Sequence, residues 1–164
     1  MLRDKSLIPL SHQHQRALAM CVRIDRASPI GESDLVAWQA EIAQIFQNEI
    51  GIHFSSEEQV VFPAARAFSE LIPLVDELCQ DHAWLREQFA VATGERGSAK
   101  DVNLLAQRLS AHIRREERQL FQRMQELMDP EALAVLGRKL YEALKDSPQA
   151  CVVPTQATRL RSAK

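Results

Sequence analysis

The chain has 164 residues, a length that fits one domain with a buried core. Apolar residues make up 46% of it and only 5 residues are glycine, a balance that favours helices over β-structure. The net charge of −2 supplies no basic surface for nucleic acid. Composition therefore predicts an all-α protein and argues against a nucleic-acid partner.

The first residues of the chain and its cysteines give information about the cellular compartment of the protein. Residues 1–15 contain no apolar run long enough for a signal peptide or a membrane span. Cys21, Cys79 and Cys151 are far apart and form no CxxC pair, which argues against a disulfide framework or a zinc knuckle. We expect a cytoplasmic protein that does not bind membranes.

Apolar residues recur at helical spacing in five successive segments. The first begins at a cap formed by Ser11 and breaks at 29–31. The second begins at a cap formed by Ser33, and Phe62-Pro63 ends or kinks it because proline lacks a backbone donor. A short helical stretch then continues to Pro73.

The remaining segments follow in the same way. The third covers residues 74–92 and is closed by Gly94, and the fourth covers residues 102–120. Asp129-Pro130 starts a fifth, in which leucines repeat at helical spacing. No strand pattern competes with these helices.

We therefore predict an all-α fold, an up-down-up-down four-helix bundle with an additional C-terminal helix. The whole chain, 1–164, is expected to be one domain, with the bundle at about 8–127, the extra helix at about 130–146 and a flexible tail at 147–164. The fifth helix could cover the bundle or pair with a second copy of the chain in a homodimer.

A repeated motif carries the chemistry. Two segments share the pattern His-x3-Glu-Glu-x2-(Val/Leu)-Phe, the first opening with His53 and Glu57 and the second with His112 and Glu116. Residues four apart lie one helical turn apart, about 6 Å along the axis. Each pair also lies on the apolar side of its helix, where an unpaired carboxylate is costly to bury. The repeat therefore predicts two His–Glu pairs that hold metal.

The other two central helices each contribute one histidine to the inward side. These are His14 and His82, whereas His12 shares a solvated side with charged residues. Four imidazoles and two carboxylates suit a pair of iron or manganese ions with open positions for a small molecule. The Glu-x-x-His pattern of ferritin-like di-iron bundles is absent from the sequence.

Three charged residues lie next to these ligands in the sequence or on the same helix. Glu58 and Glu117 lie one position off the apolar side, so we expect them to be solvated, with Glu58 an outside candidate as a substitute ligand. Arg86 could neutralise Glu87 or Asp81 at the surface or point toward the metals, and we favour the surface.

The ordered set of residues resembles the hemerythrin-like (HHE cation-binding) domain over about residues 8–127. The segment Pro9-Leu-Ser-His-Gln-His14 and the segment Glu57-Glu-Gln-Val-Val-Phe-Pro63 also resemble that family. The resemblance implies a four-helix bundle around a non-haem di-iron centre. It further implies that His14 and His53 hold one iron, that His82 and His112 hold the other, and that Glu57 and Glu116 bridge both beside an oxo or hydroxo group.

One departure from the oxygen-carrying members bears on function. Those members have His-x3-His on the third helix and His-x4-Asp on the fourth. Here Arg86 lies four residues after His82, in place of the second histidine, and Glu116 lies four residues after His112, in place of the aspartate pattern. The second iron would then lose one imidazole and gain an open position. The resemblance thus favours sensing, nitric oxide or peroxide chemistry, or iron handling over reversible oxygen storage.

Three functions are consistent with this reading. The leading hypothesis is a di-iron protein that binds or senses oxygen or nitric oxide, or handles iron, although manganese or zinc could replace iron. The second is a small di-iron oxidase or peroxidase that acts on peroxide or nitric oxide. The third is a metal-free structural bundle in which the buried histidines and glutamates form hydrogen-bonded pairs.

Overall fold

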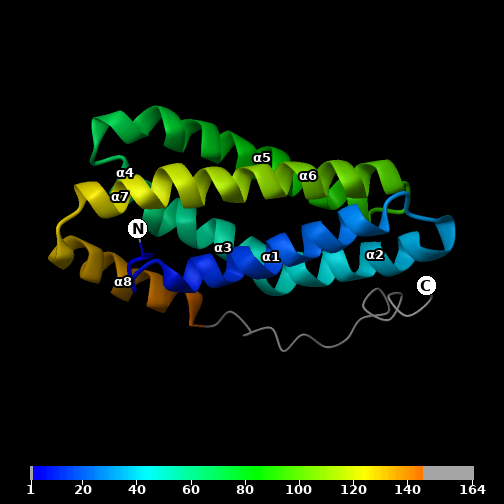
Figure 1. Ribbon diagram of the computed structural model, residues 1–164, viewed down its shortest axis with the longest axis horizontal. Helices are drawn as coiled ribbons and strands as arrows, with labels where there is room; N and C mark the ends of the chain where they lie inside the picture. Colours follow the sequence, from blue (N-terminus) through cyan, green and yellow to red (C-terminus); the bar gives the residue numbers. More distant parts are fainter. Residues whose placement is uncertain (1, 146–164) are drawn as a thin grey trace.

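The fold consists of helices packed side by side. The computed structural model describes residues 2–145, so the predicted tail at 147–164 lies outside the described residues. Within that part of the chain every regular element is a helix and none is a strand (Figure 1). The predicted all-α class, a helical bundle with an added helix, is confirmed.

Five continuous helical segments follow one another along the chain. The first is α1 (Ile8–Ala27), and the second consists of α2 (Glu32–Ile45), η1 (Phe46–Ile50), α3 (Gly51–Ser56), η2 (Glu57–Val61) and α4 (Phe62–Ala65). After the short 3-10 helix η3 (Ser69–Leu71) comes α5 (Ile72–Thr93). The last two are α6 (Ala99–Arg115) with η4 (Glu116–Leu120) and α7 (Phe121–Leu127), and then α8 (Pro130–Leu144). The elements η1, η2 and η4 are π-helical turns.

Four of the segments form the bundle and α8 packs across one end of it. Helix α1 packs against α6, α5 against α6, and α2 against α5, while α8 contacts α3 and η2. Gly137 allows α8 to approach the N-terminal segment closely, because a Cβ there would lie 2.8 Å from Ser6 Oγ. The additional helix therefore covers the end of the bundle where α1 begins (Figure 1).

The core divides into two apolar clusters. One includes Met20, Trp38, Phe89 and Leu105, and the other includes Leu10, Leu78, Leu120 and Leu136. Along every long helix of the bundle, the inward histidine lies between a residue of one cluster and a residue of the other. The two apolar clusters thus enclose a polar layer in the middle of the bundle.

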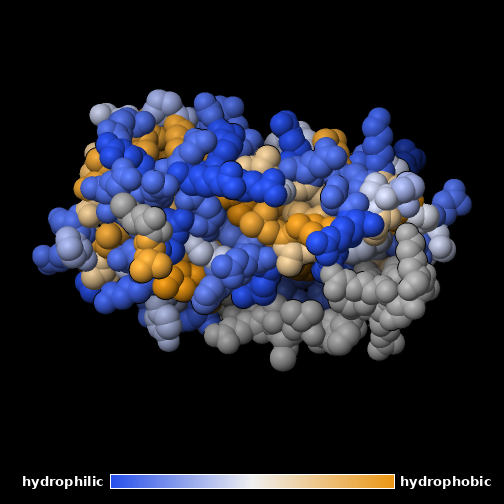
Figure 2. All heavy atoms as spheres, in the orientation of Figure 1, coloured by the Kyte–Doolittle hydropathy of each residue, from blue (hydrophilic) through white to orange (hydrophobic). Residues whose placement is uncertain are grey.

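The distribution of polar and apolar side chains on the surface is the one expected of amphipathic helices. The face in Figure 2 is mainly hydrophilic, and apolar side chains gather near its middle, where α1 and α6 lie. Among residues 2–145, no helix combines the length and the apolar character that a membrane crossing requires.

The first two helices begin earlier than the serines predicted. Helix α1 begins at Ile8 with Pro9 in its first turn, where proline fits because that turn needs no backbone donor. Ser11 therefore lies inside the helix, and its hydroxyl donates to Glu117 instead. Helix α2 begins after Gly31, so Ser33 is not its cap either. Both predicted caps were wrong.

Pro63 does not end the second segment where it stands. The helix continues to Ala65, and Pro63 lies in the first turn of α4, directly after the π-helical turn η2. A change of hydrogen-bond register at that point leaves proline without a required donor. The segment therefore extends beyond Pro63 before the chain turns toward α5.

Candidate metal centre

All six predicted ligands converge in the polar layer of the bundle. Their ligand atoms form two groups, and within each group the atoms lie within 4.8 Å of one another. The first ligand group is His14, His53, Glu57 and Glu116, and the second ligand group is Glu57, His82, His112 and Glu116. Every member is buried, and the two glutamates belong to both groups.

The glutamates lie between the two groups and face both. Glu57 Oε1 lies 3.2 Å from His53 Nε2, while its Oε2 lies 3.4 Å from His82 Nε2. Glu116 Oε2 lies 3.2 Å from His14 Nε2 and 3.3 Å from His112 Nε2. Each carboxylate is therefore placed so that it could contact two ions at once.

The imidazoles of each group also meet at their Nε2 atoms. His14 Nε2 and His53 Nε2 are 2.9 Å apart, and His82 Nε2 and His112 Nε2 are 3.1 Å apart. Four ring nitrogens and four carboxylate oxygens thus point into one small volume. Nitrogen and oxygen ligands of this kind suit iron, manganese or zinc.

The carboxylate oxygens supply a test of whether a cation fits. Glu57 and Glu116 are 0% exposed, and among the described residues all four of their side-chain oxygens lack a hydrogen-bond partner. Buried polar atoms almost always have a hydrogen-bond partner, so four buried oxygens without one indicate that a partner is missing. A bound cation would satisfy these oxygens, so the residues fit the metal that the ligand set implies.

The outward nitrogen of each ring in the first group has an acceptor. His14 Nδ1 lies 2.7 Å from Glu117 Oε1, and His53 Nδ1 lies 2.8 Å from Gln13 Oε1. These acceptors hold the hydrogen on Nδ1, so Nε2 is the nitrogen that would give up its proton and direct its lone pair at a bound cation.

The second group is built in the same way. His82 Nδ1 lies 2.9 Å from Glu58 Oε1, and His112 Nδ1 lies 3.3 Å from Asp81 Oδ2. All four imidazoles therefore have the outer hydrogen-bond partner that metal-binding histidines usually have.

Two of these outer carboxylates are less exposed than the sequence predicted. Glu58 and Glu117 were expected to be solvated, yet their side chains are only 34% and 24% exposed and each accepts from a buried histidine. Arg86 pairs with Glu58, at 2.7 and 3.0 Å, and not with Glu87 or Asp81. The prediction considered one helix at a time, whereas these partners come from neighbouring helices.

The repeated motif has a structural explanation. In both copies a π-helical turn starts at the buried glutamate, and the amide of the final phenylalanine donates to that glutamate's carbonyl: Phe62 to Glu57 and Phe121 to Glu116. Phe62 then packs on His82 with ring centroids 5.2 Å apart, and Phe121 stacks on His14 at 5.5 Å. Such turns are frequent at functional sites.

Sequence reasoning missed Gln13 and Asp81 as partners of the histidines. Each immediately precedes an inward histidine, Gln13 before His14 and Asp81 before His82. Each accepts from the histidine of the nearby repeat. No shared residue type marks these two positions in the sequence, and only their contacts show that the N-terminal and C-terminal halves of the bundle use them equivalently.

The carboxylates of the centre raise the pKa of the histidines beside them. Burial alone would lower the pKa of His14 and of His82, but the nearby carboxylates, Glu116 first among them, outweigh burial and raise both values to about 9. The pKa of His112 rises to about 10 because the charge of Glu116 and a hydrogen bond to Asp81 likewise outweigh burial.

The buried carboxylates shift in the opposite direction. Burial and the charge of Glu116 would raise the pKa of Glu57, but His53 and His82 lower it to about 2. The pKa of Glu116 lies well below its usual value, because His112 and the other histidines outweigh burial. The raised pKa values of His14, His82 and His112 favour protonated rings in the metal-free protein, and a bound cation would displace those protons.

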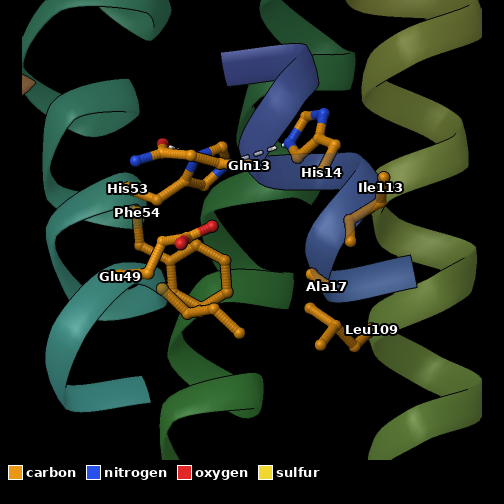
Figure 3. A pocket seen from close by; sticks show the side chains of 9 residues that line it. Gln13, His14, Ala17, Glu49, His53, Phe54, Leu109 and Ile113 are labelled. Carbon is orange, nitrogen blue, oxygen red and sulfur yellow. Dashed lines mark hydrogen bonds between the residues drawn. The ribbon is translucent and has the colours of Figure 1, made fainter. Parts of the chain in front are cut away.

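A small cavity adjoins the first ligand group. It has a volume of about 10 Å³, roughly room for one water-sized molecule. Figure 3 shows its walls, with His14 and Ala17 from α1, His53 and Phe54 from α3, and Leu109 from α6. Gln13 and Glu49 also line it, and Glu49 is held by Arg16 at 2.9 Å. His12, in contrast, is exposed, as predicted.

Fold and site together define a class of protein, a helical bundle with a buried histidine–carboxylate site suited to two metal ions. The family model for the hemerythrin HHE cation binding domain matches residues 9–145. Because this match covers more than half of the chain, the chain belongs to the hemerythrin HHE cation-binding domain family. No curated protein and no solved structure matched it. The family and the buried clusters indicate a metal-binding protein.

Proposed function

We propose that this protein binds two iron ions and uses them to bind or sense oxygen or nitric oxide. The first ligand group would hold one ion and the second ligand group the other, with Glu57 and Glu116 shared between them. The observation that carries this proposal is the set of four buried carboxylate oxygens without hydrogen-bond partners, surrounded by four imidazole Nε2 atoms.

The protein's own residues would prepare the centre for the ions. When bound, the ions would supply electrons and open positions for a small ligand. The outer acceptors hold the imidazoles by their Nδ1 atoms, so the rings need little rearrangement to bind. Phe54, Phe62 and Phe121 pack against the histidines and limit the access of water.

The cavity supports a ligand of diatomic size. It borders His14 and His53 and otherwise has mainly apolar walls, such as Ala17, Phe54 and Ile113. Apolar walls and the carboxylate of Glu49 favour a small uncharged molecule over an anion, because an anion would lose its hydration and meet a negative charge. Oxygen and nitric oxide are both small and uncharged.

Elemental analysis and an optical spectrum together test the proposal. Protein produced with iron available should contain two irons per chain, and its spectrum should change when oxygen or nitric oxide is added to the reduced form. Protein that binds no iron under these conditions would contradict the proposal and favour a structural bundle. Two equivalents of manganese or zinc in preference to iron would show that the ligand set is right and the metal wrong.

Two histidine variants make a matched comparison. His112→Ala should lower the iron content from two per chain to one or fewer, because it removes a ligand of the second group. His12→Ala should keep two irons, since His12 lies on the same stretch of α1 as His14 but is exposed. If both variants kept two irons, the ligand assignment would be wrong.

The spectra also distinguish binding from catalysis. A stable oxygen or nitrosyl adduct is the result expected of a binding or sensing protein. Steady turnover of added peroxide, lost in His112→Ala and kept in His12→Ala, would instead assign the chain as an oxidase or peroxidase. We also place the protein in the cytoplasm, which the free thiols of Cys21 and Cys79 support.

A further inference from the structure

The two ligand groups are related by an internal repeat that extends beyond the ligands. Each half of the chain supplies one inward histidine, His14 or His82, followed by a His-x3-Glu-Glu motif. In both halves the residue before the first histidine accepts from Nδ1 of the second: Gln13 from His53 and Asp81 from His112. Gln13 and Asp81 therefore occupy equivalent places and differ in charge.

The second glutamate of each repeat keeps its role in both halves. Glu58 accepts from His82 and Glu117 accepts from His14, so each repeat supports a histidine of the other ligand group. Both of these acceptors are carboxylates, and each is ion-paired to an arginine. They therefore do not distinguish the two groups.

The acceptors at positions 13 and 81 do distinguish them. Asp81 is a carboxylate held at 3.0 Å by Arg115, whereas Gln13 is a buried neutral amide. A carboxylate acceptor increases the electron density that an imidazole donates to a metal, and an amide does so much less. His112 should thus be a stronger ligand than His53.

The small cavity lies beside the first ligand group, whose histidine His53 has the neutral acceptor Gln13. Gln13, His14 and His53 line it, so the first ligand group has space for a water-sized molecule beside it. On the second group, Phe54 stacks on His82 with ring centroids 4.0 Å apart, closer than the 5.5 Å at which Phe121 stacks on His14 of the first group. The packing around the rings and the charge of their outer acceptors therefore both favour exchange of an ion at the first ligand group.

From these contacts we propose that Gln13 and Asp81 are positioning residues that make the two ion sites unequal. The second ligand group binds its ion more tightly, and the first ligand group holds an exchangeable ion. This inference rests on the proposed two-ion function, and it adds which ion leaves first and which residues decide it.

Release of iron to a chelator tests the inference. Protein loaded without oxygen with two equivalents of ferrous iron is mixed with a chelator that forms a coloured complex, and release is followed over time. Two phases of one equivalent each are expected in the unmodified protein. Asp81→Asn should weaken the slowly released ion by about 10-fold or more, as loss of an outer partner usually does, and should leave the fast phase unchanged.

A reciprocal variant and a control complete the experiment. Gln13→Glu gives His53 a charged acceptor and should slow the fast phase toward the slow one. Glu77→Gln removes an exposed carboxylate that also pairs with Arg115 but does not contact His112, so both phases should remain. A single phase of two equivalents in the unmodified protein, or unchanged phases in Asp81→Asn, would overturn the inference while leaving the two-ion function intact. Failure to load iron would overturn both.

Discussion

The two ligand groups share two carboxylates and yet have different surroundings. In the second group both outer acceptors are carboxylates, and Phe54 stacks on His82 at 4.0 Å, closer than Phe121 stacks on His14 of the first group, at 5.5 Å. In the first group one outer acceptor is the amide of Gln13, and a water-sized cavity reaches the histidines. The comparison teaches that an internal repeat can keep the residues that face the metals while the residues behind them diverge.

Loss of a shared carboxylate should affect both groups and have the largest effect. Glu116→Gln removes a charged oxygen ligand from each group, so we expect the iron content to fall from two per chain to near zero. His14→Ala, which alters only the first group, should retain about one iron. Elemental analysis of both variants checks this. Retention of one iron by Glu116→Gln would show that the carboxylate serves a single group.

The phenylalanines at the ends of the repeats should contribute equally to stability. Phe62 and Phe121 are both buried, and each packs on a histidine of the other repeat's half. Substitution of either by alanine should destabilise the metal-free protein by about 3–5 kcal/mol, the usual cost of a Phe-sized cavity. Urea unfolding measures this, with the exposed Tyr141→Ala as a control that changes little. A large difference between Phe62 and Phe121 would break the symmetry of the repeats.

The pH dependence of metal binding tests what both groups share. The pKa values of His14 and His82 are about 9 and that of His112 is about 10 before a metal binds. These rings must lose their protons to bind, so affinity should rise with pH from 6 to 9, by about tenfold per unit for each proton released. Titrations with ferrous iron at several pH values check this. An affinity that does not change with pH would contradict the protonated state of the empty centre.

The second glutamate of each repeat should affect the ion site to which the histidine that it contacts belongs. Glu58→Gln should weaken the ion of the second group and Glu117→Gln that of the first, by about 10-fold each. The same chelator assay resolves the two ions, and Glu87→Gln provides an exposed control next to Arg86. Should Glu58→Gln weaken the first group instead, the crossed arrangement of the repeats would be wrong.

Arg86 should have the smallest effect. It holds Glu58 but is about one third exposed, and ion pairs of this kind contribute below about 1 kcal/mol. Arg86→Ala should therefore reduce affinity at the second group by no more than about fivefold. Arg66→Ala, which breaks an exposed pair with Asp76, is the matched control. A loss of iron as large as that of His112→Ala would mean that Arg86 does more than hold Glu58.

Helical periodicity predicted much of the fold, and the failures have local causes. The spacing of apolar residues indicated five helical segments, and the bundle with its added helix is confirmed. The predicted starts of the first two helices were wrong because Ser11 and Ser33 looked like caps, whereas α1 begins at Ile8, just before Pro9, and α2 is capped by Gly31. Capping residues also occur inside helices, so residue type alone does not locate an end.

The sequence predicted the ligands of the candidate site but not their outer hydrogen-bond partners. The His-x3-Glu spacing placed His53 with Glu57 and His112 with Glu116, and the structure brings these residues together with His14 and His82. The outer partners were missed or assigned to solvent, because Glu58 and Glu117 meet histidines on other helices. Their roles depend on which helices become neighbours.

Local sequence settled which residues share a helical face, because a helix turns by a constant amount per residue. It therefore settled the helical class, the repeated motif and the inward place of four histidines. The packing of helices decided which carboxylate supports which imidazole and that Gln13 and Asp81 face equivalent histidines. It also decided that residues of α1, η1, α3 and α6 line a small cavity. The hydrogen bonds from the outer partners to the imidazoles join residues 24 to 103 positions apart, so only the tertiary structure could place them.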